Sequence, residues 1–401
     1  MKKRYFDNQS SSKLDNIVLD EMLPFFCNNY GVPQSIHSFG IVVKKAVEKA
    51  RYNVAKLFNA YPDEIIFTSC GTEANNLAIK GIVELSRNPI KHIIVSSIEH
   101  ISILQTLKLL IQQGVQVTFL PVNKYGSIDR TALKNSILDN TILISIQYAN
   151  PEIGTIQNIK ELVSIVREQS NNNIIFHTDA VSACGKVKIN VKDLDVDMLT
   201  VSSSVIHGPK GAAALYIRRG VKLSQQIHGG IQEFGQRAGT ENVPAIVGFG
   251  KACEIARTEF KINNAKIIAL RDKMLVGITK KIDYISLNGP VIKNRLCSNI
   301  NLSVKFVEGE SLVLLLDALG IIVSSGSACS SYNLKGSHVL KAIKVDRMLQ
   351  QGTIIFNLSK FNTMADIRSV LIELPKCVSK LRKISSLHLN VSKGIDNNIN
   401  N

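Results

Sequence analysis

From about residue 60 onward, short apolar runs alternate with stretches that have apolar residues at helical spacing. The apolar runs predict strands at 64–68, 92–96, 116–120, 141–147, 173–178, 197–202 and 213–217. Residues 73–87 and 101–113, which lie between strands, show the periodicity of amphipathic helices. This repetition predicts an α/β fold with a largely parallel sheet covered on both faces. Ligands bind such sheets beyond the carboxyl ends of the strands.

A different pattern follows the glycine-rich loop before residue 243. Residues 243–282 predict a long helical region leading into a smaller α+β domain. That domain would contain a strand at 299–306, a helix at 308–318 and the loop 324–331. A chain of 401 residues also exceeds what one hydrophobic core usually supports, which favours two domains. The last dozen residues are polar and repetitive, so we expect a disordered tail.

Composition narrows the class of protein. Hydrophobic residues make up 45% of the chain and charged residues 20%, which is typical of a folded, soluble protein. No apolar run approaches the roughly 20 residues of a membrane span. The start, MKKRYFDNQSSSK, lacks the apolar stretch of a secretory signal. We therefore expect a cytoplasmic protein that does not associate with membranes.

The formal net charge of +16 raises the question of an anionic partner. However, the lysines are spread along the chain, no long basic run stands out, and there is no tryptophan. No nucleic-acid motif is recognisable. We predict no specific nucleic-acid partner, although nonspecific binding at low salt is compatible with this charge.

The cysteines are odd in number and widely scattered, without a CxxC pair: Cys27, Cys70, Cys184, Cys253, Cys297, Cys329 and Cys377. This pattern argues against a disulfide framework and a zinc site. Cys329 differs from the others because it lies in SSGSACSS, a loop of small residues where a thiol would be accessible. It is either a nucleophile or an incidental loop cysteine.

Three further positions suggest ligand binding. In TSCGTEANN (68–76) a strand ends and a helix begins, so Gly71 and Thr72 form either a phosphate seat or an ordinary helix cap. Asp179, at the end of a strand, could hold a cation or cap the next helix. His100 also follows a strand and is either a ligand-stacking or a structural histidine. No Walker loop, dinucleotide fingerprint or Ser–His–Asp order accompanies them.

Motifs in the same order as those of the NifS/IscS cysteine desulfurases extend over nearly the whole chain. They are YFDN (5–8), VPQSIHSFG (32–40), FTSCGTEANNLAIKG (67–81), SSIEH (96–100), PEIGTIQ (151–157), HTDAVSACGK (177–186), HGPKGAAALYIRR (207–219), RAGTENV (237–243), VEGESL (307–312) and SSGSACSS (324–331). The chain resembles this family too consistently for chance.

The resemblance implies a fold-type I pyridoxal-phosphate transferase of the class V aminotransferase branch, normally a homodimer. The implied organisation is an N-terminal segment (1–14) packing with the small domain, a large domain (15–255), a small domain with the Cys329 loop (256–389) and the tail (390–401). The family takes sulfur from L-cysteine, leaves L-alanine and carries the sulfur as a persulfide to iron–sulfur cluster assembly or tRNA thiolation.

The resemblance also implies roles for individual residues. Those matching cofactor contacts are Gly71 and Thr72 at the phosphate, His100 stacked on the ring, Asp179 at the ring nitrogen, Ser202 at the phosphate and Thr240 at the phosphate of the partner subunit. Cys329 matches the persulfide cysteine. No metal is implied.

Several positions depart from the family pattern. Where the family has SxHKxxGPKG, this chain has SSSVIHGPKG, so Val205 replaces the Schiff-base lysine and Ser204 the preceding histidine. Lys210 belongs to the GPKG turn that the family also has, which makes it a poor substitute. The other replacements are Pro151 for an asparagine near the ring hydroxyl, Ser182 for a glutamine, Ile355 for the arginine that grips the substrate carboxylate, Val32 for an asparagine and Phe234 for an arginine.

These losses predict that ordinary desulfurase turnover is abolished. A lost charge-assisted contact costs about 1.5–3 kcal/mol, and a lost proton shuttle costs ~10²–10⁴ in rate. One remaining possibility is a binding protein, whose partner would be a second copy of itself, an active desulfurase or an iron–sulfur scaffold protein. Another is a persulfide carrier that acts through Cys329. A slow enzyme with noncovalently bound pyridoxal phosphate, and a protein without a present role, also stay open.

Overall fold

The computed structural model describes residues 3–170, 174–326 and 336–384. Cys329, most of its loop and the tail from residue 390 lie outside the described residues. In the described part of the chain, no helix is long and apolar enough to cross a membrane.

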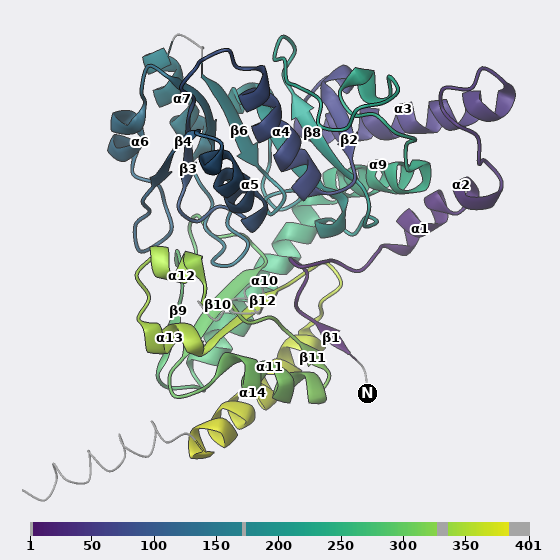
Figure 1. Cartoon of the computed structure of the whole chain (residues 1–401). Coiled ribbons are helices and arrows are strands. Elements are labelled where there is room, and N and C mark those ends of the chain that lie inside the picture. The colour runs from purple at the N-terminus through teal and green to yellow at the C-terminus, as the bar shows by residue number, and fades with distance from the viewer. Residues whose placement is uncertain (1–2, 171–173, 327–335, 385–401) are drawn as a thin grey trace, which may run out of the picture.

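The described residues form a seven-stranded sheet (Figure 1). In spatial order its strands are β2 (Ile65–Thr68), β8 (Ala213–Ile217), β7 (Met198–Ser202), β6 (Ile175–Asp179), β5 (Thr141–Ser145), β3 (His92–Ser96) and β4 (Gln116–Leu120). Only β8 runs antiparallel to its neighbours. The expected α/β fold with a mainly parallel sheet is confirmed, and the predicted strand ranges differ from the observed ones by at most two residues at either end.

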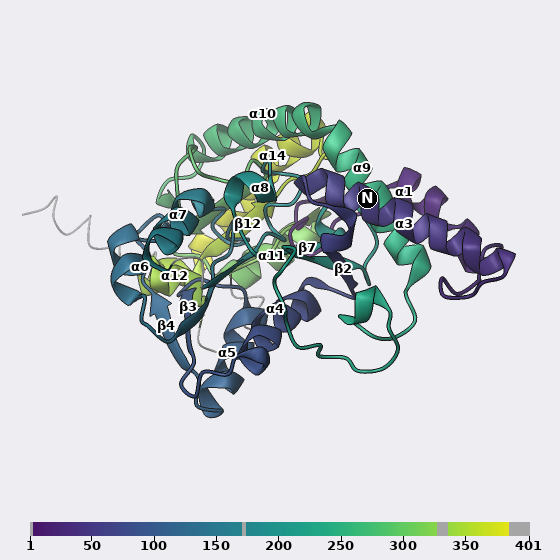
Figure 2. The same ribbon diagram turned by 90° about the horizontal axis from the view of Figure 1, so that it is seen from above.

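Helices cover both faces of this sheet, as Figure 2 shows. One face carries α4 (Gly71–Leu85) and α5 (Ile101–Gln112), and the other carries α3 (Ser38–Phe58), α7 (Ile159–Ser170) and α9 (Val243–Thr258). Successive strand residues point to opposite faces. Ile66 therefore packs under α4, whereas Phe67 packs with α3 and α9.

Shorter elements complete this part of the chain. They are α1 (Asn16–Met22), α2 (Pro24–Cys27), η1 (Pro62–Glu64), α6 (Arg130–Ser136), α8 (Val191–Leu194), η2 (Ser203–Val205) and η3 (Glu233–Gly235). The predicted helical region 243–282 is two helices, because the chain leaves helical geometry at Glu259 before α10 (Phe260–Thr279) begins.

A second hydrophobic core lies below the large sheet in Figure 1. It is built on an antiparallel sheet in the order β12 (Thr353–Asn357), β10 (Asn299–Val304) and β9 (Ile285–Leu287). The helices of this region are α10, α11 (Gly309–Ala318), α12 (His338–Ala342), α13 (Arg347–Gln351) and α14 (Met364–Ile384).

The N-terminal segment reaches both parts of the molecule. Strand β1 (Arg4–Tyr5) pairs in parallel with β11 (Ile321–Ile322), and Asn8 donates to the carbonyl of Asn357. The chain then crosses to the large sheet, where Ser12 binds the turn that follows β7. This crossing places residues from both ends of the sequence beside the candidate site.

Candidate functional site

The candidate site is built at one edge of the large sheet. Strands β2, β3, β6 and β7 all end at this edge, with Thr68, Ser96, Asp179 and Ser202 as their last residues. The sequence-predicted residues Gly71, Thr72 and His100 follow the ends of β2 and β3 within four residues. The parallel topology therefore explains why residues more than a hundred positions apart come together.

The N-terminus of α4 approaches the end of β7 closely. A Cβ atom added to Gly71 would lie 3.1 Å from Cγ2 of Val181 and 4.0 Å from Cβ of Ser202. Cys70 precedes the helix and makes no side-chain cap hydrogen bond, and Thr72 is exposed. Uncapped N–H groups at the start of a helix attract anions. The N-terminus of α4 with Gly71 and Thr72, together with Ser202, therefore suits the binding of a phosphate group.

Asp179 is held in a hydrogen-bond network that leads to His100. Its carboxylate accepts from Nδ2 of Asn75 at 2.8 Å and from the backbone N–H of Val181 at 3.0 Å. Asn75 also donates to Oγ of Ser102 at 3.0 Å, and this oxygen lies 2.8 Å from Nδ1 of His100. Asn75 and Ser102 therefore connect the carboxylate of Asp179 with the imidazole of His100 through a chain of hydrogen bonds.

Glu99 lies behind this network and is completely buried. Its carboxyl group accepts from the hydroxyl of Ser96 and, at 3.0 and 3.1 Å, from the backbone N–H of Gln147. Burial, together with the negative charge of Asp179, raises the pKa of Glu99 to about 8. Glu99 is therefore largely protonated at neutral pH and adds no full charge beside Asp179.

Val205 occupies the position expected for the cofactor lysine. It ends η2, is 6% exposed and belongs to the main hydrophobic core. The preceding Ser204 lies with its Oγ 3.2 Å from Oγ of Ser202. Lys210, the other lysine of this segment, is exposed. The turn that follows β7 therefore carries an apolar, buried side chain where an amine was expected.

The N-terminal segment forms hydrogen bonds with this turn and with the residues after β6. The hydroxyl of Ser12 donates to the carbonyl of Ser204 at 2.7 Å and accepts from the backbone N–H of His207 at 2.8 Å. Gln9 donates to Oγ of Ser182 at 2.9 Å and accepts from Nζ of Lys186 at 2.9 Å. Ser182, one turn after Asp179, is thus contacted by an amide from the other end of the chain.

Ile355 lies in the middle of β12 and is 5% exposed. Its neighbours Ile354 and Phe356 belong to the second core, so the side chain of Ile355 faces away from that core. Its backbone exchanges hydrogen bonds with Ser324, at 2.8 and 3.2 Å. An aliphatic residue therefore stands where the sequence comparison expects an arginine.

The loop that carries Thr240 is anchored by two ion pairs. Arg51 makes two bonds of 2.7 Å to the carboxylate of Glu233, and both side chains are buried. Phe234, at φ 56° and ψ 30°, packs against the Arg51 guanidinium. Arg237 binds Glu73 on α4 at 2.8 Å. Thr240 itself is exposed.

The structure thus gathers Gly71, Thr72, His100, Asp179 and Ser202 at one edge, whereas Thr240 lies on a separate exposed loop. Sequence reasoning missed Asn75 and Glu99. Asn75 follows Thr72 by three residues on the same helix, which was an available signal. Gln9 gave no signal, because its partner Ser182 becomes a neighbour only through tertiary structure.

Comparisons with known proteins agree with this fold. The family profile described as Aminotransferase class-V matches residues 4–370. A relative named cysteine desulfurase IscS from Methanosarcina thermophila is 48% identical over 96% of this chain and 94% of its own. One from Clostridium botulinum is 46% identical over 96% and 97%.

Solved structures agree as well. A chain named NifS-like protein superposes with a TM-score of 0.89 at 36% identity, covering 94% of this chain and 99% of its own. A NifS-like protein from Rickettsia africae has a TM-score of 0.83 at 28% identity, covering 95% and 100%.

Proposed function

Since the chain belongs to the class V aminotransferase family, we propose that it is a NifS-like protein that has lost ordinary cysteine desulfurase turnover. The observation that carries the proposal is Val205, a buried aliphatic residue at the lysine position. Ile355 supports it, because a buried aliphatic side chain provides no charge for a substrate carboxylate.

The residues present fit part of the family's cofactor. The α4 terminus with Gly71 and Thr72 suits the phosphate of pyridoxal phosphate, and the fixed carboxylate of Asp179 suits its ring nitrogen. When bound, this cofactor stabilises negative charge next to an amino group. Covalent attachment does not fit, because Val205 has no amine and Lys210 is exposed. We therefore expect noncovalent binding.

The retained fold would then act by binding or by sulfur transfer. Exposed apolar side chains gather on the α2–α3 region and on the loop it contacts: Phe26 (56%), Tyr30 (68%), Ile36 (94%), Ile231 (86%) and Phe234 (60%). Arg51 stacks on Phe234, and Gln34 binds Glu241, so the two segments are adjacent. Apolar patches of this kind mark protein interfaces. They favour a homodimer or a heterodimer with an active desulfurase.

Alanine release from L-cysteine, with pyridoxal phosphate in excess, tests the loss of turnover. We expect none above the rate of cofactor alone, and steady release would overturn the proposal in favour of a slow noncovalent enzyme. That alternative draws support from the intact Asp179–Asn75–Ser102–His100 network.

Sulfur transfer has its own test. An active desulfurase charged with labelled cysteine serves as the persulfide donor to the wild-type protein and to Cys329→Ser. Label on the wild type alone would support a persulfide carrier, whereas equal labelling of the two proteins would exclude that role for Cys329. Capture of an iron–sulfur scaffold protein by both forms would favour binding alone.

A further inference from the structure

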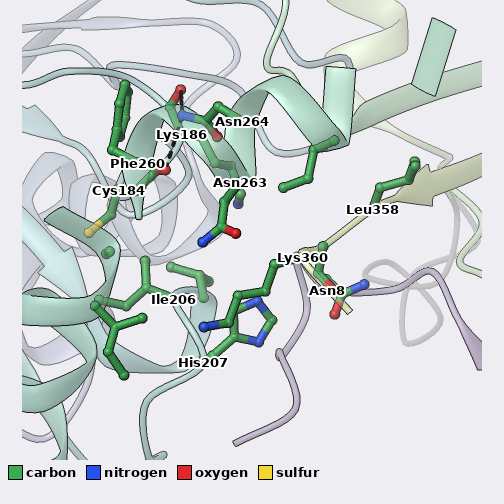
Figure 3. Close-up of a pocket in the computed structure, with 16 residues that line it drawn as sticks. Asn8, Cys184, Lys186, Ile206, His207, Phe260, Asn263, Asn264, Leu358 and Lys360 are labelled. Carbon is green, nitrogen blue, oxygen red and sulfur yellow. Dashed lines mark hydrogen bonds between the residues drawn. The ribbon is translucent and has the colours of Figure 1, made fainter. Parts of the chain in front are cut away.

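A cavity of about 60 Å³ lies behind the turn that holds Val205. It is lined by the segments 184–186 and 205–207, by the start of α10 and by the chain after β12 (Figure 3). In the described chain, Thr72, His100, Asp179 and Ser202 are not among its lining residues. The cavity therefore adjoins the candidate site at Val205 without including these four expected cofactor contacts.

Lys186 is one of the residues that line this cavity, and its amine has no charged partner within the part of the chain that the structure describes. Its Nζ donates to Oε1 of Gln9 at 2.9 Å and to the carbonyl of Ser182 at 3.4 Å. Both acceptors are neutral, and no carboxylate of the described residues forms an ion pair with it. Burial lowers the pKa of Lys186. A larger share of Lys186 is consequently in the neutral, nucleophilic form than for a lysine in water.

The other basic side chains that line the cavity, Lys360 and His207, are ion-paired or neutral. Lys360 is paired with Asp15 at 2.7 Å and with Glu259 at 3.3 Å. His207 donates from Nδ1 to the carbonyl of Lys13, and burial lowers its pKa to about 4, so its ring is neutral. Ile206, Phe260 and Leu358 add apolar surface. These surroundings favour an uncharged ligand over an anionic one.

We propose that Lys186 is a carbonyl-reactive lysine that binds a short, uncharged aldehyde as an imine. The neutral amine adds to the carbonyl carbon, and one proton moves from nitrogen to oxygen to give a carbinolamine. The second N–H proton is then lost from nitrogen and a proton is gained by the hydroxyl, which leaves as water when the C=N bond forms. No oxidant or metal takes part. A water molecule needs about 10–15 Å³ by the same measure, so the volume of the cavity suits a ligand of about four non-hydrogen atoms.

Reductive labelling of the full-length protein tests this proposal. Propionaldehyde and cyanoborohydride convert an imine into a stable propyl-lysine, which peptide mass spectrometry locates. We expect Lys186 to be labelled severalfold faster than Lys188, an exposed lysine two positions along the chain. Labelling of Lys186 at the rate of Lys188, or slower, would overturn the proposal. This comparison within the wild-type protein does not depend on any variant folding.

Two substitutions of Gln9 sharpen the test. Gln9→Glu places a carboxylate beside Nζ, which stabilises the ammonium form and should reduce the labelling of Lys186 to the level of Lys188. Gln9→Met removes the same hydrogen bond without adding charge, so labelling should stay fast. Equal rates in the two variants would contradict the proposed role of the neutral amine. Since no step involves pyridoxal phosphate, either result leaves the proposed function untouched.

Discussion

Gln9 and Ser182 are 173 residues apart in the sequence, yet Nε2 of Gln9 donates to Oγ of Ser182 at 2.9 Å. The family resemblance matches Ser182 to a glutamine, and in this chain the Ser182 side chain is contacted by a glutamine amide from the N-terminal segment. The same amide accepts from Lys186, so one residue connects the candidate site with the cavity behind it.

Restoring an amine at position 205 should restore covalent attachment of the cofactor. Val205→Lys is expected to retain pyridoxal phosphate after borohydride reduction and denaturation, whereas the wild type should lose it. Because position 205 is buried in the main core, the variant without cofactor should also unfold at a lower temperature than the wild type.

Val205→Met is the matched control for this experiment, since it lengthens the side chain without an amine. Retention of the cofactor by Val205→Met or by the wild type would show that another lysine provides the attachment. Alanine production should stay low in Val205→Lys until Ile355→Arg is added, because the lost carboxylate contact is worth about 1.5–3 kcal/mol.

Much of the fold could be predicted because local pattern and tertiary structure agree in the large sheet. The strands at 92–96 and 213–217 occur at the predicted positions, since each is a buried run between helices, and the edge strand at 116–120 also occurs where predicted although it is partly exposed. The break at Glu259 had no local signal, as neither glycine nor proline marks it. The ion pair between Arg51 and Glu233 could not be predicted either, because sequence patterns report spacing along one element and not contacts between elements.

Asn75 should control the binding of the cofactor through Asp179. Asn75→Leu removes the 2.8 Å hydrogen bond to the carboxylate and the 3.0 Å bond to Ser102. Leaving buried polar groups without these partners costs about 1–3 kcal/mol. The dissociation constant for pyridoxal phosphate, measured by absorbance titration, should rise about tenfold or more. The neighbouring Asn76→Leu is the control, and an equal loss in both variants would argue against a specific role for Asn75.

The Arg51–Glu233 pair should be a major support of the Thr240 loop. Glu233→Gln leaves the buried guanidinium without its carboxylate, which costs about 3–5 kcal/mol for a buried pair. A clear decrease in the thermal unfolding midpoint is expected. The exposed pair Lys49–Glu21 provides the contrast, since Glu21→Gln should cost less than about 1 kcal/mol. Similar midpoints for the two variants would mean that the loop is held by other contacts.

Glu99 should make the protein less stable as the pH rises. Its pKa is about 8 in the folded protein, against about 4.3 in an unfolded chain. Between these values the folded state binds one proton more than the unfolded state, so the free energy of unfolding decreases with increasing pH and levels off above pH ~8. One pKa unit corresponds to about 1.4 kcal/mol, which makes the decrease in the free energy of unfolding a few kcal/mol.

Glu99→Gln, uncharged at every pH, should lose this decrease in urea unfolding curves recorded from pH 5 to 8. The exposed Glu48→Gln should retain the wild-type slope. A Glu99→Gln variant with that same slope would show that Glu99 is ionised in the folded protein at neutral pH.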